Sequence, residues 1–231
     1  MLFIVIFFVY GLVIGSFLNV VIYRLPHGIS LSYPASHCPY CQTKLKIRDL
    51  MPVLSFLLVR GRCRYCHKPI RLRYILVELG TGLFLAALYM RSGLSIISLV
   101  VALMGFTLIS SAFIVYDEHP LPTKLLVFMG FFIIVKQFLQ PLPLMDWLGT
   151  LVLASILFLY RKRQAKDFDT ELLLLCTGLF TGFELFALLL LLSWGTSTLF
   201  HCIMYYSLLS WHQQTHRALV ILSYALFALL I

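Results

Sequence analysis

The sequence carries very little charge for its length: only 12% of its 231 residues are Asp, Glu, Lys or Arg, whereas 61% are hydrophobic. A soluble domain cannot bury that much apolar surface, so the composition excludes an ordinary soluble enzyme and predicts lipid around much of the chain. Residues 1–23 carry no charge at all. A secretory signal peptide would begin with a basic region and end at a small-residue cleavage site, so we interpret this segment as a retained membrane span.

Internal repeats and low-complexity tracts are also lacking, and apolar runs dominate the pattern. We predict an all-α, polytopic membrane protein of about eight transmembrane helices, with soft boundaries because some runs are shorter than the roughly 20 residues that a bilayer core requires. The eight runs are Met1–Tyr23, Tyr74–Met90, Leu94–Tyr116, Leu125–Leu142, Asp146–Tyr160, Leu172–Ser193, Gly195–Trp211 and Ala218–Ile231.

Basic residues are concentrated in one loop. Ten of the 18 Lys and Arg residues lie within residues 24–73. Such a cluster can bind nucleic acid or anionic lipid. Beside a membrane span, however, basic residues more often mark the side of the span that faces the cytoplasm, so we expect no nucleic-acid partner. If this loop is cytoplasmic, alternating spans place 16 basic residues inside and leave only Arg91 in an outside loop. The charge bias therefore predicts an amino terminus outside the cytoplasm.

Two cysteine pairs in the same loop have the spacing of a metal site. Cys38-Pro-Tyr-Cys41 and Cys63-Arg-Tyr-Cys66 are separated by 21 residues. Two such pairs converge to give tetrahedral thiolate coordination, which suits zinc, and the basic surroundings favour the thiolate form. Redox chemistry is the alternative, but it needs only one pair. We predict a structural zinc ion that stabilises a loop with too little core to fold alone. Its ligands would be Cys38, Cys41, Cys63 and Cys66.

Carboxylates are scarce, and two aspartates lie at the ends of predicted spans. Asp117 follows the span Leu94–Tyr116, and Asp169 precedes the span Leu172–Ser193. The orientation deduced from charge puts both on the cytoplasmic side. Two carboxylates that converge there would share a proton, and such a pair can activate water and protonate a scissile amide. The alternative, which spacing alone favours, is that Asp169 caps its helix and Asp117 is solvated.

A few other polar residues fall inside the spans. We predict that Ser16 and Asn19 pack helices together. Glu78 lies one turn inside the second span and would line a polar cavity, whereas Glu184 has no partner that the sequence identifies. Buried cysteine behaves as a small hydrophobe, so we expect no role for the two cysteines of the apolar spans. These are Cys176 and Cys202.

Together these residues resemble the type IV prepilin peptidases, bacterial membrane enzymes of the GxGD-type aspartic class. The resemblance is densest from Gly11 to about Gly82. The segment 15–26 is similar to the family's first span and its exit, the cysteine pairs match its cytoplasmic zinc module, and the segment 60–66 continues the match. The resemblance implies an amino-terminal region over residues 1–92, with the first two spans and the zinc loop.

The remaining residues, 93–231, would then form a membrane-embedded aspartic peptidase region. The resemblance implies an endopeptidase that removes a basic leader from type IV pilin-like precursors at the cytoplasmic face of the bacterial cytoplasmic membrane. Asp117, followed by Leu121-Pro122, and Asp169 would be its catalytic pair. Many members also methylate the new amino terminus with S-adenosylmethionine, although no methyl-donor fold is visible in this sequence. The implied partners are pilin-like precursors and the lipid bilayer.

One motif departs from the family pattern. The family's second aspartate closes a Gly-x-Gly-Asp motif, whereas Lys166-Asp167-Phe168-Asp169 stands in that place here. Glycine would let backbone and substrate approach closely. Asp167 is therefore an alternative to Asp169, although the distance to the following leucine run favours Asp169. A family member that has lost its peptidase centre and serves as a binding or assembly protein for pilin-like or competence machinery is the alternative function. A solute transporter or channel would need more polar residues at mid-membrane.

Overall fold

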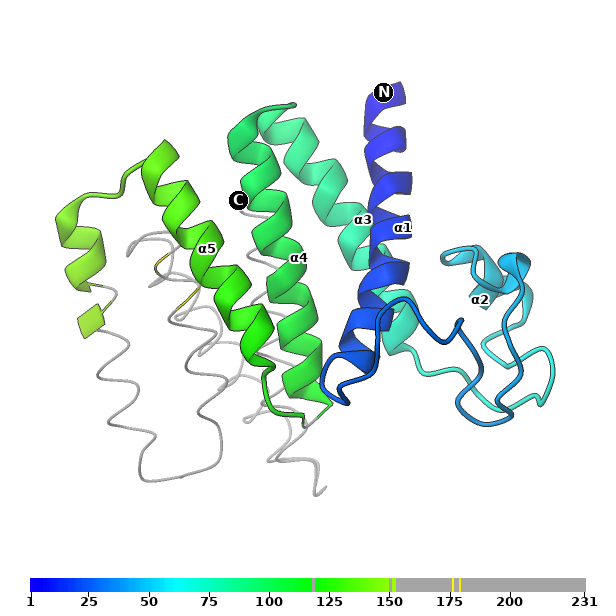
Figure 1. Cartoon of the computed structure of the whole chain (residues 1–231). Coiled ribbons are helices and arrows are strands. Elements are labelled where there is room, and N and C mark those ends of the chain that lie inside the picture. The colour runs from blue at the N-terminus through cyan, green and yellow to red at the C-terminus, as the bar shows by residue number, and fades with distance from the viewer. Residues whose placement is uncertain (118, 150, 153–175, 177–178, 180–231) are drawn as a thin grey trace, which may run out of the picture. The chain divides into compact units, whose positions relative to one another are not determined.

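The structure is a computed structural model that describes residues 1–117, 119–149, 151–152, 176 and 179. Within these residues it is helical and contains no β-strand, as the sequence predicts (Figure 1). The chain divides into two compact units, Met1–Ser98 and Leu99–Ile231. The helices are α1 (Leu2–Arg24), the 3-10 helix η1 (Ile47–Asp49), α2 (Leu54–Leu58), α3 (Arg73–Ser92), α4 (Ile96–Tyr116) and α5 (Thr123–Leu139).

Three helices, α1, α3 and α4, are long and apolar enough to cross a membrane. They coincide with the first three predicted spans. The fourth predicted span forms the 17-residue helix α5. Its predicted end at Leu142 is wrong: the helix stops at Leu139, because a residue that precedes proline avoids the helical conformation and Pro141 follows. Nearly all of the last four predicted spans lie outside the described residues, so the total of eight stays a prediction.

Helices α1 and α3 form an antiparallel pair that packs through glycine. A Cβ atom built at Gly11 would lie only 2.6 Å from the Cα atom of Gly82, and one built at Gly15 would lie 2.7 Å from the Cα atom of Glu78. These distances are too short for any side chain, so the two backbones touch at both points. Small residues four apart on one face permit this close approach between membrane helices.

Asn19 continues the same face of α1 by a further four residues. Its Nδ2 atom donates a 3.0 Å hydrogen bond to the carbonyl oxygen of Tyr74 on α3, as expected for a residue that packs helices. At the other end of the pair the rings of Phe7 and Tyr89 stack with centroids 4.4 Å apart. The helix pair is thus held along its whole length, which fixes the two ends of the loop that joins α1 to α3.

Replacing Gly11 by Leu should separate the helix pair. The added side chain has no space to occupy, and overpacking of this kind costs about 1–3 kcal/mol. Gly80→Leu is the matched control, because a Cβ atom at Gly80 would meet nothing within 4 Å. We expect a lower Tm for the detergent-solubilised Gly11→Leu protein and an unchanged Tm for Gly80→Leu. Equal Tm values for the two variants would contradict this packing.

In the second unit, α4 and α5 lie side by side (Figure 1). The hydroxyl of Ser111 on α4 contacts the sulfur of Met129 on α5 at 4.0 Å, and both residues are fully buried. The buried residues of α5 recur along one face of the helix. These residues are Leu125, Met129, Phe132 and Ile133. A short segment that contains Pro120 and Pro122 joins α4 to α5. Asp117 is the first residue of this segment, directly after the end of α4.

Candidate metal centre and catalytic aspartates

The first cysteine pair lies in a tight turn of the loop between α1 and α3. The backbone N–H of Cys38 donates to the carbonyl of Thr43 at 3.0 Å, and the N–H of Gln42 donates back to the carbonyl of Cys38 at 2.9 Å. Gln42, directly after Cys41, has a φ of 57°. The left-handed backbone conformation of Gln42 reverses the direction of the chain, so that both sulfur atoms face the same side.

The second cysteine pair repeats this design. The N–H of Cys63 donates to the carbonyl of Lys68 at 2.8 Å, and the N–H of His67 donates back to the carbonyl of Cys63 at 2.9 Å. His67 follows Cys66 and has a φ of 58°, like its counterpart Gln42. Two turns of the same geometry therefore present four thiols from residues far apart in the loop.

The four thiols converge on one point. All four Sγ atoms lie within 4.8 Å of one another, and those of Cys38 and Cys66 are 3.9 Å apart. A tetrahedral zinc ion with Zn–S bonds of about 2.3 Å would hold its sulfur ligands about 3.8 Å apart. Cys38 and Cys63 are buried, whereas Cys41 and Cys66 are partly exposed. The cluster can therefore hold a zinc ion with little rearrangement.

Local hydrogen bonds make these thiols unequal. Hydrogen bonds from the Thr43 side chain and backbone lower the pKa of Cys41 to about 6. At Cys66 the backbone N–H of Lys68 acts in the same direction, but desolvation and the neighbouring thiols outweigh it and raise the pKa to about 11. A bound divalent cation favours the thiolate form of every ligand, so it would remove these differences.

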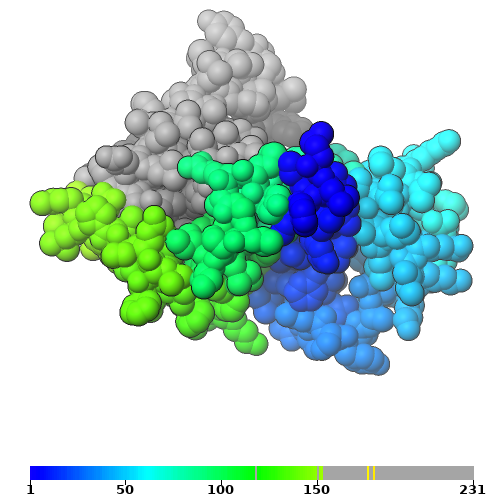
Figure 2. All heavy atoms as spheres, turned by 90° about the horizontal axis from the view of Figure 1, so that it is seen from above, coloured from blue at the N-terminus to red at the C-terminus, as the bar shows by residue number. Residues whose placement is uncertain are grey.

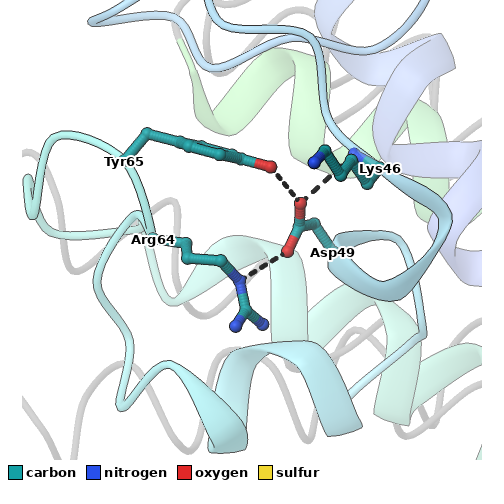
Figure 3. Close-up of polar contacts among 4 residues, drawn as sticks. All are labelled: Lys46, Asp49, Arg64 and Tyr65. Atoms are coloured by element: carbon teal, nitrogen blue, oxygen red, sulfur yellow. Dashed lines mark hydrogen bonds and ion pairs between the residues drawn. The ribbon is translucent and has the colours of Figure 1, made fainter.

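Asp49 holds the two halves of the loop together (Figure 3). Its Oδ1 accepts a 2.8 Å hydrogen bond from Arg64 Nε, and its Oδ2 accepts hydrogen bonds from the hydroxyl of Tyr65 at 2.8 Å and the backbone N–H of Lys46 at 3.2 Å. Desolvation alone would raise the pKa of Asp49, but these three donors outweigh it and lower the pKa. The sequence alone predicts no role for Asp49. The sequence feature that could have indicated a role is that Asp49 is the single acidic residue among ten basic ones in residues 24–73.

Asp49→Ala should loosen the cysteine loop. The change removes the acceptor that Tyr65, Arg64 and the backbone N–H of Lys46 share, and with it the contribution of these hydrogen bonds to the stability of the loop. Because the folded pKa lies below the value of about 3.9 in an unfolded chain, this contribution is complete at neutral pH and is lost as pH falls through the folded pKa. We expect faster transfer of zinc to a colorimetric chelator at pH 7. Lys44→Ala, which removes an exposed charge outside this network, is the control, and equal rates for both variants would contradict the role of Asp49.

Glu78 connects the loop to the membrane helices. Its Oε2 accepts a 2.8 Å hydrogen bond from the backbone N–H of Val53, and the residue is only 9% exposed. The loop backbone directly before α2 therefore donates a hydrogen bond to α3 at this residue, while a polar cavity beside Glu78 stays a prediction. Sequence spacing does not reveal such a contact, because the donor is a main-chain group 25 residues away.

Asp117 lies at the carboxyl end of α4, the place predicted from the apolar pattern. Its backbone N–H donates to the carbonyl of Phe113 at 3.0 Å, and its side chain is partly exposed. Asp167, Asp169 and Glu184 lie outside the described residues, so the meeting of Asp117 with a second carboxylate stays a prediction. The described cysteine of the carboxyl-terminal half, Cys176, is a free thiol.

The fold and the cysteine cluster together define a helical membrane protein with a four-cysteine loop between its first two spans. Residues 9–92 match the family model of the bacterial peptidase A24 N-terminal domain. A prepilin leader peptidase/N-methyltransferase of Pseudomonas putida is 33% identical over 218 residues, which cover 80% of this chain and 75% of the relative. The chain therefore belongs to the prepilin leader peptidase/N-methyltransferase family.

Other relatives match over shorter segments. A type 4 prepilin-like proteins leader peptide-processing enzyme of Escherichia coli O78:H11 is 44% identical over 133 residues, 48% of this chain and 48% of the relative. A prepilin leader peptidase/N-methyltransferase of Klebsiella pneumoniae is 46% identical over 110 residues, 42% of this chain and 48% of the relative. The chain thus spans about half the length of these two relatives. No solved structure matches the chain.

Proposed function

We propose that the chain is an aspartic endopeptidase of the cytoplasmic membrane that removes the basic leader from type IV pilin-like precursors. The observation that supports this most is the similarity over 218 residues to a relative named for leader-peptidase activity. The proposal divides the chain into an amino-terminal region, residues 1–92, and a peptidase region, residues 93–231. The amino terminus would lie outside, with the cysteine loop and the active site on the cytoplasmic side.

In this proposal Asp117 and Asp169 form the catalytic pair. Two neighbouring carboxylates share one proton because like charge opposes ionisation of both. The ionised carboxylate takes a proton from water, and the resulting hydroxide attacks the scissile carbonyl carbon. The protonated carboxyl group then donates its proton to the leaving amine, so that the pair is regenerated with its single proton.

The cysteine cluster has a structural part in the proposed function. Cys38, Cys41, Cys63 and Cys66 would hold zinc with four protein ligands, which leaves no open position for water or substrate. The metal would therefore fix the loop between α1 and α3 and take no part in peptide cleavage. Methylation of the new amino terminus with S-adenosylmethionine is the second activity that the relatives' names suggest. We assign none of the described residues to it.

The test is to co-express the chain with a type IV pilin precursor in a host that lacks its own leader peptidase. We expect the precursor to shorten, with a new amino terminus at the junction of the basic leader and the hydrophobic helix. A methylated amino terminus in the same product would add the second activity. A precursor that stays full-length would contradict the proposal.

One observation favours a second candidate function. Lys166 and Phe168 occupy the positions of the two family glycines, and their side chains would hinder close approach of a substrate backbone. A protein without cleavage activity would bind pilin-like precursors or competence machinery. Co-purification of an uncleaved precursor with the chain is the result expected of that function, whereas cleavage contradicts it.

A further inference from the structure

The short helix α2 carries an exposed apolar surface. Leu54, Leu57 and Leu58 are 52%, 59% and 73% exposed, and no residue of this helix is charged. Ile47 and Met51, just before the helix, are 87% and 44% exposed. We call these five residues the α2 patch. A contiguous patch of large apolar side chains on a polar loop marks a surface that meets an apolar partner.

The α2 patch lies at the depth of the membrane helices. Val53, directly before α2, is hydrogen-bonded to Glu78, which lies about 7–8 Å along α3 from Arg73 at 1.5 Å per residue. Gly15 touches the backbone of Glu78 from α1, and it lies about 13 Å along α1 from Arg24. The backbone of Glu78 therefore lies about 7–13 Å inside the basic ends of the two spans. The side chain of Glu78, which leans toward the amino terminus of α3, joins the start of α2 to this level.

Figure 1 shows the position of the loop along α1, and Figure 2 shows its position to the side of α1. Figure 1 shows the loop that contains α2 beside the carboxyl-terminal half of α1, not extended beyond its end. Figure 2, seen from above, shows the same loop to one side of α1. Interfacial helices insert their apolar face about 5–10 Å into the boundary between headgroups and acyl chains, which matches the depth of α2.

The charge beside the α2 patch fits anionic headgroups. Lys46, Arg48 and Arg60 flank the patch in sequence and are all exposed. The single carboxylate of residues 24–73, that of Asp49, is already paired with Arg64. Apart from this paired carboxylate, the charged side chains that flank the patch in sequence are all basic, and juxtamembrane basic residues bind anionic lipid surfaces.

We propose that α2 anchors the cysteine loop to the bilayer. The α2 patch enters the boundary between headgroups and acyl chains, and Lys46, Arg48 and Arg60 contact anionic headgroups. Together with the bond from Val53 to Glu78, this anchor holds the cysteine cluster at a fixed height beside α1 and α3. A second copy of the chain could also cover an apolar face, but contact with a second copy would not require basic residues around the patch.

Site-specific photocrosslinking of the full chain in nanodiscs tests the anchor. The variant Leu57→p-benzoylphenylalanine is reconstituted in a mixture of phosphatidylglycerol and phosphatidylethanolamine, irradiated, and examined by intact mass spectrometry. We expect lipid adducts comparable to those from the same label at Leu83, an exposed position within the span α3, and several-fold more than at Tyr40, an exposed ring of the first cysteine turn. A label at Leu54 repeats the measurement, and zinc content shows that each variant is folded.

Two outcomes would overturn the proposal. Labels at Leu57 and Leu54 that form no lipid adduct, while the label at Leu83 does, would show that α2 is in water. Crosslinks from Leu57 to a second copy of the chain would show that another protomer covers the patch. We also expect replacement of phosphatidylglycerol by phosphatidylcholine to reduce the adducts at Leu57 several-fold, and an unchanged yield would contradict the contact with anionic headgroups.

Discussion

Asp117→Asn is expected to reduce leader cleavage by about 10²–10⁴-fold, the range for removal of a general acid or base. Asparagine keeps the size of the side chain but can neither hold the shared proton nor accept one from water. Because Asp117 directly follows α4 and is partly exposed, the substitution should leave the helix and its packing intact. The measurement is the rate of precursor shortening by purified protein in lipid, compared with that of the unmodified chain.

Asp169→Asn should cause the same loss, and the double variant should be no slower than either single variant, because the two groups act as one unit. Asp167→Asn decides between the two aspartates of the segment 166–169, and we expect it to retain activity. Asp146→Asn is the control for loss of a carboxylate outside the proposed pair. Cleavage that survives both Asp117→Asn and Asp169→Asn would remove the proposed mechanism.

Cys63→Ser is expected to lower zinc from about one ion per chain to almost none. Cys63, one of the four proposed ligands, is 7% exposed, and its backbone N–H donates to the carbonyl of Lys68, so its thiol lies in a closed turn. Structural zinc sites of this kind contribute about 10–16 kcal/mol of binding free energy, far more than a small loop gains from its core. The loop should then be cut by protease at concentrations that leave the unmodified protein intact.

Cys176→Ser is the matched control, since this thiol is free and far from the cysteine pairs in sequence. It should retain zinc and protease resistance. Zinc is measured by elemental analysis of protein purified without added metal. A full complement of zinc in Cys63→Ser, or none in the unmodified protein, would contradict the metal site.

The features that the sequence predicted correctly are those encoded locally. Continuous apolar runs located α1, α3 and α4, because a lipid environment demands apolar residues on every side of a span. The two Cys-x-x-Cys pairs located the sulfur cluster, because each turn fixes two ligands within four residues. In contrast, α5 ended earlier than its apolar run, since Pro141 acts on the backbone and leaves hydropathy unchanged.

The contacts that the sequence did not predict depend on tertiary structure. Gly11 and Gly15 are four apart, which is a signal for close helix approach, but their partners on α3 follow only from the antiparallel register. The hydrogen bond from Val53 to Glu78 has a main-chain donor, and every residue except proline carries such a donor, so the residue type does not reveal the contact. Asp49 was recognisable only as a lone acid in a basic loop, and its three donors come from two separate segments.

The proposed activity depends most on the proximity of Asp117 and Asp169. The direct measurement is to replace both by Cys in a chain whose Cys176 and Cys202 are Ser, and to add a short thiol-reactive crosslinker to the membrane-embedded protein. Peptide mass spectrometry should then find a crosslink between positions 117 and 169, and none in the control pair with Cys at positions 117 and 184. Single labelling of both positions without any crosslink between them would contradict a shared catalytic site.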